Sequence, residues 1–247
     1  MSVVIVTGGS RGIGAAVCRL AGARGYDVIV NYARDASAAD RVVAEIEAAG
    51  GRALAVGADV STEDGVAALF EAAGARGRLS GVVCNAAITG NRLSRLDEQD
   101  VDTVRAVLDV NVTGVFLCLR AAVRRMSTRY GGHGGVIVTV SSTAAHRGSP
   151  GEWVHYAASK AAVETMTRGL AQEVAREGIR VNAVAPGLVE TEVHARAGAP
   201  DRVERVAPLI PLGRAGQPEE IAEGIVWLLS SASSFVTGSV LTISGGR

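Results

Sequence analysis

The sequence predicts an α/β fold in which about seven parallel strands form one sheet with helices on both faces. Short β-branched apolar runs alternate with segments of helical apolar spacing along the whole chain. The strand-like runs are continuously apolar, which is typical of strands buried on both faces of a parallel sheet. A glycine-rich turn follows the first run, at residues 8–14. These three observations favour a single, doubly wound, Rossmann-like domain over residues 1–247.

The expected elements follow one another at short intervals. The runs that indicate strands are 3–6, 28–30, 53–56, 81–84, 136–140, 180–184 and 240–243. The segments with helical spacing are 12–25, 36–49, 64–73, 100–129 (one or two helices), 155–177 and 218–229. Ser61 or Thr62 is a candidate N-cap of the third helix, and Pro218 suits the first turn of the last one. Residues 188–212 remain as a long loop region with three prolines, which we expect to bind the substrate.

Composition and charge exclude several classes of protein. The 247 residues include 25 Lys and Arg and 25 Asp and Glu, so the formal net charge is zero. No basic block indicates a nucleic acid or an anionic membrane as a partner. No apolar run approaches the ~20 residues that span a bilayer, and residues 1–10 lack the basic segment of a secretory signal. The three cysteines are scattered and form no CxxC pair, so we expect a cytoplasmic protein.

The turn after the first strand has the sequence TGGSRGIG over residues 7–14. Glycines in this place permit a tight turn and let the backbone approach a phosphate, and the next helix presents free N–H groups. The spacing G-x-x-x-G-x-G at the first strand of an α/β chain therefore predicts a dinucleotide site. The residues of this turn that we expect to bind the cofactor are Gly8, Ser10, Arg11, Gly12, Ile13 and Gly14.

The end of the second strand indicates which dinucleotide binds. NAD sites usually place an acidic residue there for the ribose hydroxyls, but here no carboxylate occurs before Asp35. The guanidiniums of Arg11 and Arg34 instead suit a 2′-phosphate. The sequence therefore predicts NADP(H) in preference to NAD(H). The cofactor residues expected at this strand end are Asn31, Tyr32, Ala33 and Arg34.

Tyr156 and Lys160 stand four residues apart in the longest expected helix, so both side chains lie on one face. Lys160 is the only lysine of the chain, and all its other basic residues are arginines. A tyrosine of ordinary pKa, ~10, is a poor base near neutrality. An adjacent ammonium lowers that pKa by stabilising the phenolate. The use of one compact ammonium among many guanidiniums therefore indicates an acid–base pair.

Several motifs occur in one order along the chain, and together they make it resemble the short-chain dehydrogenases/reductases. The resemblance covers essentially the whole chain, and it is strongest to 3-oxoacyl-carrier-protein-reductase-like and glucose-dehydrogenase-like oxidoreductases. It implies hydride transfer between a nicotinamide cofactor and a ketone or secondary alcohol. The motifs are TGGSRGIG at 7–14, Asn85-Ala86-Ala87, Asn111, Ser142, Tyr156-x-x-x-Lys160 and Pro186-Gly187.

The resemblance also implies a role for each catalytic residue. Tyr156 would be the general acid/base, and Lys160 would lower its pKa and bind the nicotinamide ribose. Ser142 would polarise the substrate oxygen; it is preferred to Ser141 because it precedes Tyr156 by 14 residues, near the family spacing. Asn111 would hold a relay water. The further cofactor contacts that the resemblance implies are Asp59, Val60, Asn85, Ala86, Pro186, Gly187, Val189 and Thr191.

The small-molecule carbonyl or alcohol is expected to bind between residues 144–153 and 188–212. Three of the four histidines, His146, His155 and His194, are irregularly spaced and imply no metal site. The family usually has glycine at the position of Ala87, and the additional methyl group alters the space beside the cofactor. The residues proposed for the substrate pocket are Ala144, Trp153, Leu188 and His194.

Two other functions stay open at this point. One is a dinucleotide-binding sensor or scaffold without turnover. The other is an isomerase or dehydratase on the same fold, with Glu152 or His155 as the additional acid or base. The resemblance further implies that helices at 100–129 and 155–177 pair across a two-fold axis, with a second contact at the C-terminal strand. A homotetramer, or a homodimer, is therefore expected.

Overall fold

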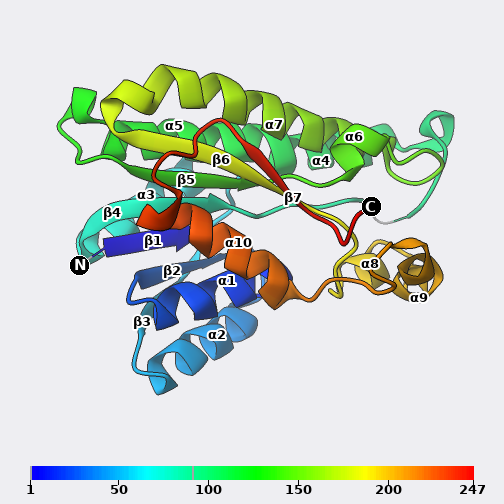
Figure 1. The fold of residues 1–247 in the computed structure, drawn as a ribbon, viewed down its shortest axis with the longest axis horizontal. Helices are drawn as coiled ribbons and strands as arrows, with labels where there is room; N and C mark the ends of the chain where they lie inside the picture. Colours follow the sequence, from blue (N-terminus) through cyan, green and yellow to red (C-terminus); the bar gives the residue numbers. More distant parts are fainter. Residues whose placement is uncertain (1, 91) are drawn as a thin grey trace.

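The computed structural model describes residues 2–90 and 92–247 and places a seven-stranded sheet between two layers of helices (Figure 1). All neighbouring strands are parallel, in the order β3-β2-β1-β4-β5-β6-β7. Each predicted strand run lies inside one of them, and the predicted fold class is confirmed. The strands are β1 (Ser2–Val6), β2 (Asp27–Tyr32), β3 (Arg52–Gly57), β4 (Arg78–Cys84), β5 (Gly135–Val140), β6 (Ile179–Pro186) and β7 (Val240–Ile243).

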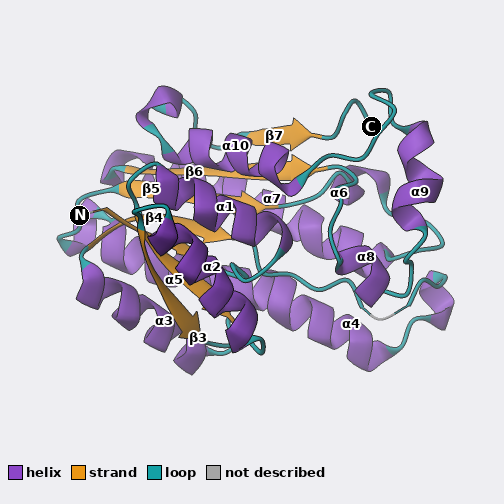
Figure 2. Cartoon of the chain, turned by 90° about the horizontal axis from the view of Figure 1, so that it is seen from below, coloured by secondary structure: helices purple, strands orange, loops and turns teal. Residues whose placement is uncertain are grey.

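The long helices are divided between the two faces of the sheet (Figures 1 and 2). One face carries α1 (Gly12–Ala23), α2 (Ala36–Ala48) and α10 (Pro218–Leu229). The other carries α3 (Glu63–Arg76), α5 (Gly114–Met126) and α7 (Val154–Val174), with α4 (Val101–Leu108) preceding α5. The short helices are α6 (Ala144–Arg147), α8 (Val193–Arg196) and α9 (Arg202–Val206).

Strand β1 shows why the strands are apolar at every position. Val4 and Val6 belong to the core under α1, α2 and α10, whereas Val3 and Ile5 belong to the core under α3, α5 and α7. All four side chains are fully buried. Because successive side chains of a strand point to opposite faces, only an unbroken apolar run fills both cores. Burial of each such side chain stabilises the folded state by about 1.5–3 kcal/mol relative to leaving it exposed.

Local hydrogen bonds set where several helices begin. Thr62, rather than Ser61, caps α3 by accepting the Gly65 N–H at 3.1 Å. Asp35 caps α2 by accepting the Ala38 N–H at 3.0 Å. At α10 the Glu220 carboxylate accepts the Gln217 N–H at 2.8 Å. Caps of this kind are worth roughly 1 kcal/mol each, so the polar residues before the apolar runs determine these boundaries.

The segment predicted as one or two helices consists of α4, a π-helical turn over Asp109–Thr113, and α5. By length and mean hydropathy alone the stretch Val101–Met126 could cross a membrane, although charged residues interrupt its apolar runs. In the fold, its residues Val115, Cys118 and Ala122 pack into the core beside the sheet. A buried core helix meets the same length and hydropathy criterion, so the stretch is weak evidence for a membrane.

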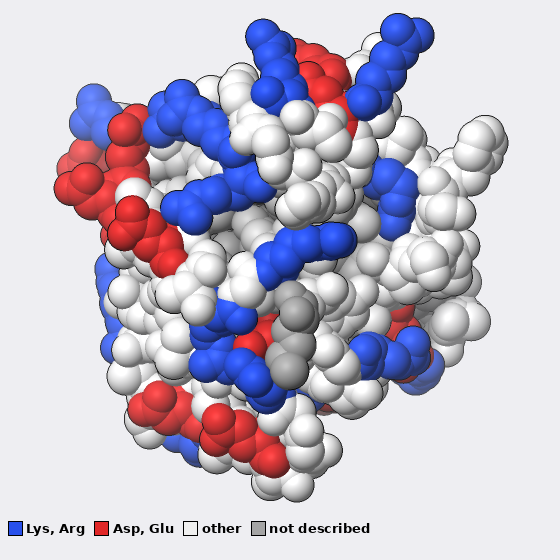
Figure 3. All heavy atoms as spheres, turned by 90° about the vertical axis from the view of Figure 1, so that its left-hand side faces the viewer, with Lys and Arg blue, Asp and Glu red and all other residues white. Residues whose placement is uncertain are grey.

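The order of the strands determines where a ligand can bind. The chain turns back at the boundary between β1 and β4, which are neighbours although β2 and β3 intervene in sequence. A crevice forms outside the carboxyl ends of the strands at such a switch point. The region 188–212 covers this end, and it contains α8, α9 and a 3₁₀ turn over Ala207–Leu209 rather than loop alone. The face at the amino ends of the strands shows acidic and basic side chains interspersed (Figure 3).

Candidate active site

A cleft of about 920 Å³ lies at the carboxyl ends of the strands. Every residue predicted to bind the cofactor lines it, from the glycine turn to Thr191. Three of the four predicted catalytic residues, Ser142, Tyr156 and Lys160, line it as well. Segments far apart in the sequence therefore meet around one cavity, as the strand order requires.

The glycine turn has the backbone shape that a pyrophosphate site needs. Gly8 and Gly12 have φ of +62° and +51°, a conformation that other residues rarely adopt. A Cβ at Gly14 would lie 2.2 Å from the Gly8 carbonyl oxygen, so only glycine fits there. No side chain caps the first turn of α1, whose N–H groups stay available for an anion. These residues fit the phosphates of a dinucleotide.

Three polar side chains hold this turn in place. Asn31 accepts the Gly8 N–H at 3.3 Å and donates to the Ala58 carbonyl at 3.0 Å, which ties the turn to the end of β3. Asn85 donates to the Gly8 carbonyl at 3.1 Å. The Thr7 hydroxyl accepts the Asn85 N–H at 2.9 Å. Thr7 was not among the predicted residues, although its place at the end of the first strand was a signal for this role.

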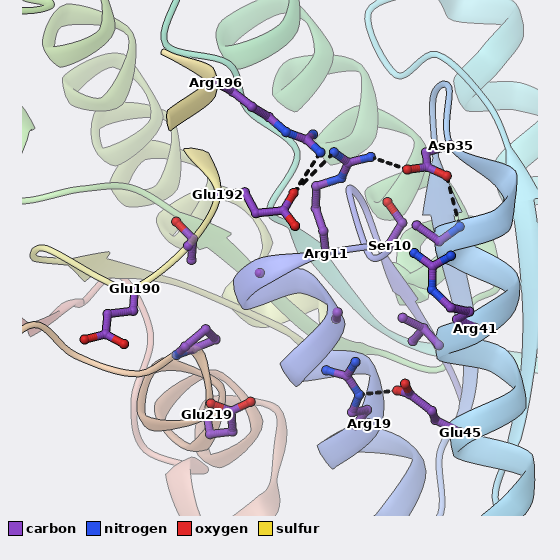
Figure 4. A pocket seen from close by; sticks show the side chains of 16 residues that line it. Ser10, Arg11, Arg19, Asp35, Arg41, Glu45, Glu190, Glu192, Arg196 and Glu219 are labelled. Atoms are coloured by element: carbon purple, nitrogen blue, oxygen red, sulfur yellow. Dashed lines mark hydrogen bonds and ion pairs between the residues drawn. The ribbon is translucent and has the colours of Figure 1, made fainter. Parts of the chain in front are cut away.

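A second hollow, of about 500 Å³, adjoins the glycine turn (Figure 4). Here Arg11 donates to the Asp35 carboxylate at 2.9 Å and lies 3.9 Å from that of Glu192. Glu192 also pairs with Arg196 at 2.8 Å. The guanidinium of Arg11 is therefore paired with carboxylates, whereas the sequence predicts that it binds a phosphate. Arg34 is exposed at the end of β2 and lines the larger cleft.

The adjacent serines at the end of β5 have different surroundings. Ser142 is hydrogen-bonded to Tyr156, and its oxygen accepts the Ala144 N–H at 3.1 Å. Ser141 is buried and donates to the Glu164 carboxylate at 2.9 Å. Ser142 is therefore the serine that contacts the tyrosine, and Ser141 anchors the strand end to α7.

Lys160 lies in α7, one turn after Tyr156, and is only 2 % exposed. Its Nζ donates to the Val140 carbonyl at 2.7 Å and lies 5.6 Å from the centroid of the Tyr156 ring. Burial lowers the pKa of Lys160 from 10.5 to about 8. The ammonium is thus held at the floor of the cleft by a backbone acceptor on β5.

The pKa of Tyr156 differs from the sequence expectation in sign. Burial raises this pKa, and the influences that lower it are the Ser142 hydrogen bond and the charge of Arg202. Lys160, which we expected to lower the pKa, is not among these influences. The physical reason is that desolvation of the phenolate outweighs its favourable contacts in the protein alone.

Asn111 lies in the π-helical turn and is fully buried. Its amide donates to the Ile88 carbonyl at 2.8 Å and to the Ser159 hydroxyl at 3.0 Å, and its carbonyl accepts the Ile88 N–H at 2.9 Å. The side chain does not line the cleft. It connects the segment after β4 with α7, next to Lys160.

The substrate end of the cleft is lined by Ala144, Trp153 and Leu188. Trp153 is 4 % exposed, and its indole N–H donates to the Arg92 carbonyl at 3.0 Å. The side chain of His194 lies outside the described part of the structure. Three arginines also line this end: Arg147 and Arg202, from the two ranges expected to bind the substrate, and Arg247, which was not predicted.

Two of the other histidines have partners of their own. His146 lies 3.2 Å from the Glu164 carboxylate, and the His155 ring meets the Thr89 carbonyl at 2.9 Å. Glu152, considered as an additional acid or base, pairs with Arg202. Among residues 2–90 and 92–247, no three His, Cys, Asp or Glu side chains gather as metal ligands.

Comparison with known proteins agrees with this geometry. The family model described as "Enoyl-(Acyl carrier protein) reductase" matches residues 8–247. Over its whole length the chain is 49 % identical to the uncharacterized oxidoreductase YgfF of Escherichia coli, and all of that protein is covered. It is 43 % identical to 3beta-hydroxysteroid dehydrogenase 1 of Eggerthella lenta, covering 98 % of this chain and 92 % of that protein.

Among solved structures, a short-chain dehydrogenase/reductase from Mycobacterium marinum superimposes with a TM-score of 0.92 at 38 % identity. The superposition covers 99 % of this chain and 94 % of that one. The chain belongs to the short-chain dehydrogenase/reductase family. It is an oxidoreductase that acts on a CH–OH or carbonyl group with a nicotinamide cofactor.

Proposed function

We propose that this enzyme transfers a hydride between NADP(H) and a ketone or secondary alcohol, with Tyr156 as the general acid/base. The observation that carries the proposal is that Ser142, Tyr156 and Lys160 line one cleft together with the glycine turn. A substrate oxygen placed between the serine and the tyrosine would receive hydrogen bonds from both. These bonds stabilise the charge that develops on the oxygen as hydride is transferred.

The roles of the other residues follow from their partners. Lys160 has one hydrogen bond, to Val140, in a position 2 % exposed. An ammonium has three donors, so it can also reach a ribose hydroxyl and supply positive charge beside the phenolate. The hydride itself is supplied or accepted by the nicotinamide ring when the cofactor is bound. Asn111 holds the backbone at Ile88 to Ser159 of α7 through its hydrogen bonds. We propose that it supports the proton relay from this position.

Arg34 supports NADP(H) as the preferred cofactor. Its guanidinium is exposed at the end of β2, where an acidic residue would select NAD(H). Arg11 would have to exchange its Asp35 partner for a 2′-phosphate. Titration with NADPH and NADH tests this preference, and tighter binding of NADH would contradict it.

Replacing Tyr156 with phenylalanine tests the mechanism, because this change removes only the hydroxyl. We expect kcat to fall by roughly 10²–10⁴-fold, the usual worth of general acid–base catalysis, while cofactor affinity is retained. The assay is the absorbance of the reduced nicotinamide with a panel of ketones and alcohols. Tyr130→Phe is the matched control, since Tyr130 is 58 % exposed and does not line the cleft. Unchanged turnover of Tyr156→Phe would disprove the assigned role.

We also propose a cytoplasmic homotetramer. Large apolar side chains are exposed on the helices expected to pair, including Phe116 at 53 %, and near the C-terminal strand, where Phe235 is fully exposed. Burial of such side chains drives association. The mass in solution tests the proposal, and a monomer at micromolar concentration would refute it.

A further inference from the structure

The substrate end of the cleft carries more positive than negative charge. The guanidiniums of Arg147, Arg202 and Arg247 gather there around one carboxylate, that of Glu152. The charges are close enough to act on one another: the pKa of Arg247 is lowered first by burial and then by Arg147 and Arg202, while Glu152 raises it. No Asp or Glu side chain in residues 2–90 and 92–247 forms an ion pair with Arg147 or Arg247, and Glu152 pairs with Arg202. The cluster therefore has more guanidinium groups than side-chain carboxylates.

Arg202 is the most restricted member of this cluster. Its side chain is 15 % exposed, its Nη1 pairs with Glu152, and its guanidinium lies 4.9 Å from the centroid of the Trp153 ring. Within the described residues neither Nε nor Nη2 of Arg202 has an acceptor. The protein encloses Nε, so Nη2 is the donor that a ligand can reach. Glu152 and Trp153 thus hold the guanidinium in place with Nη2 unpaired.

This donor lies near the reacting groups. Arg202 and Tyr156 line the same cleft. The Arg202 guanidinium lies over the Trp153 ring, and Tyr156 packs against the cluster that contains this ring. The charge of Arg202 also lowers the pKa of Tyr156. An acceptor for Arg202 would then belong to the same small molecule as the oxygen that meets Tyr156.

We propose that the substrate carries a carboxylate near its reacting carbonyl or hydroxyl, and that Arg202 binds this carboxylate. The substrate class is then a short oxo acid or the corresponding hydroxy acid. The inference rests on the proposed oxidoreductase function and adds the charge of the substrate. A carboxylate would accept a hydrogen bond from Nη2 of Arg202 and offset the positive charge of the cluster, since charge-assisted guanidinium–carboxylate hydrogen bonds are among the strongest in proteins. A neutral ketone would not offset this charge.

The test compares acids with their uncharged esters. The probes are pyruvate, acetoacetate and levulinate, each assayed beside its methyl ester with reduced cofactor. We expect kcat/KM of the wild-type enzyme to favour one acid over its ester by at least about tenfold, which corresponds to ~1.4 kcal/mol. Arg202→Met should lower kcat/KM for that acid by about 10–100-fold and have a much smaller effect on the ester.

Two further variants separate recognition from a structural role. Glu152→Gln removes the competing carboxylate and should lower KM for the acid. Arg205→Met is the matched control on the same helix, since Arg205 is 53 % exposed and pairs with Asp201; it should leave the acid-to-ester ratio unchanged. Equal losses on acid and ester in Arg202→Met would show that Arg202 only holds α9 in place, and would overturn the inference.

The proposed function and this inference fail in different ways. If the wild-type enzyme reduces the ketone group of the keto esters and of neutral ketones, and prefers none of the keto acids, the carboxylate assignment is wrong and the hydride-transfer function stands. If it reduces the ketone group of none of these compounds and oxidises no alcohol with either nicotinamide cofactor, the proposed function itself is wrong.

Discussion

Replacing Lys160 with methionine measures the energetic cost of the buried ammonium. Lys160 is 2 % exposed, and burial lowers its pKa from 10.5 to about 8. The folded protein therefore binds this proton less tightly than the unfolded chain does. Between these two pKa values the unfolded chain binds more protons, so this lysine makes the free energy of unfolding rise with pH across that window.

The magnitude follows from the two pKa values. The fall from 10.5 to about 8 corresponds to a penalty of about 3.4 kcal/mol at neutral pH, at ~1.36 kcal/mol for each pKa unit. About 2.5 kcal/mol of this is relieved by about pH 10. Methionine carries no charge and leaves the Val140 carbonyl without its donor, a loss of roughly 1–3 kcal/mol that does not vary with pH.

The assay is urea unfolding of wild type and Lys160→Met from about pH 7 to about pH 10, at one protein concentration. The stability of the wild type relative to the variant should increase by about 2.5 kcal/mol over this range. Arg176→Met serves as the control, because it removes an exposed cation that does not titrate here. A difference in unfolding free energy that stays constant with pH would refute the assignment of a destabilised ammonium.

Three other changes test the site. Lys160→Arg should fold but lose at least about 100-fold in kcat/KM, which corresponds to ~2.7 kcal/mol, because a guanidinium is larger than an ammonium and planar. Thermal melting measures the folding and steady-state kinetics the activity, and near-wild-type turnover would contradict the prediction. Gly14→Ala should lower the free energy of unfolding by about 1–3 kcal/mol and weaken cofactor binding, since its Cβ would lie 2.2 Å from the Gly8 oxygen. Urea unfolding and cofactor titration measure the two effects, and an unchanged affinity would show that the turn adapts. Asp35→Ala should lower the free energy of unfolding by roughly 1 kcal/mol, because it removes the N-cap of α2. It should also shift binding towards NADPH over NADH, because Arg11 loses its partner. An unchanged ratio of the NADPH and NADH affinities in titrations would exclude Arg11 from phosphate recognition.

The elements of the fold could be predicted because their signals are local. The apolar run of β1 and the Pro218 start of α10 depend on neighbours within a few residues. The π-helical turn around Asn111 could not be predicted, since its hydrogen bonds reach Ile88 and Ser159, far away in sequence. Nor could the short helices within 188–212, which are too short for periodicity to distinguish from loop.

The sequence alone determined that this protein is an α/β enzyme with a dinucleotide cofactor. Its glycine spacing and the Tyr156–Lys160 pair depend on geometry between residues that are close together along the chain. Only the tertiary structure decided the charges around them. Packing paired Arg11 with Asp35 and desolvated Tyr156 enough to raise its pKa. It also brought Arg202 into the same cleft as that tyrosine. Electrostatic and desolvation effects depend on distances through space, which residue spacing along the chain does not contain.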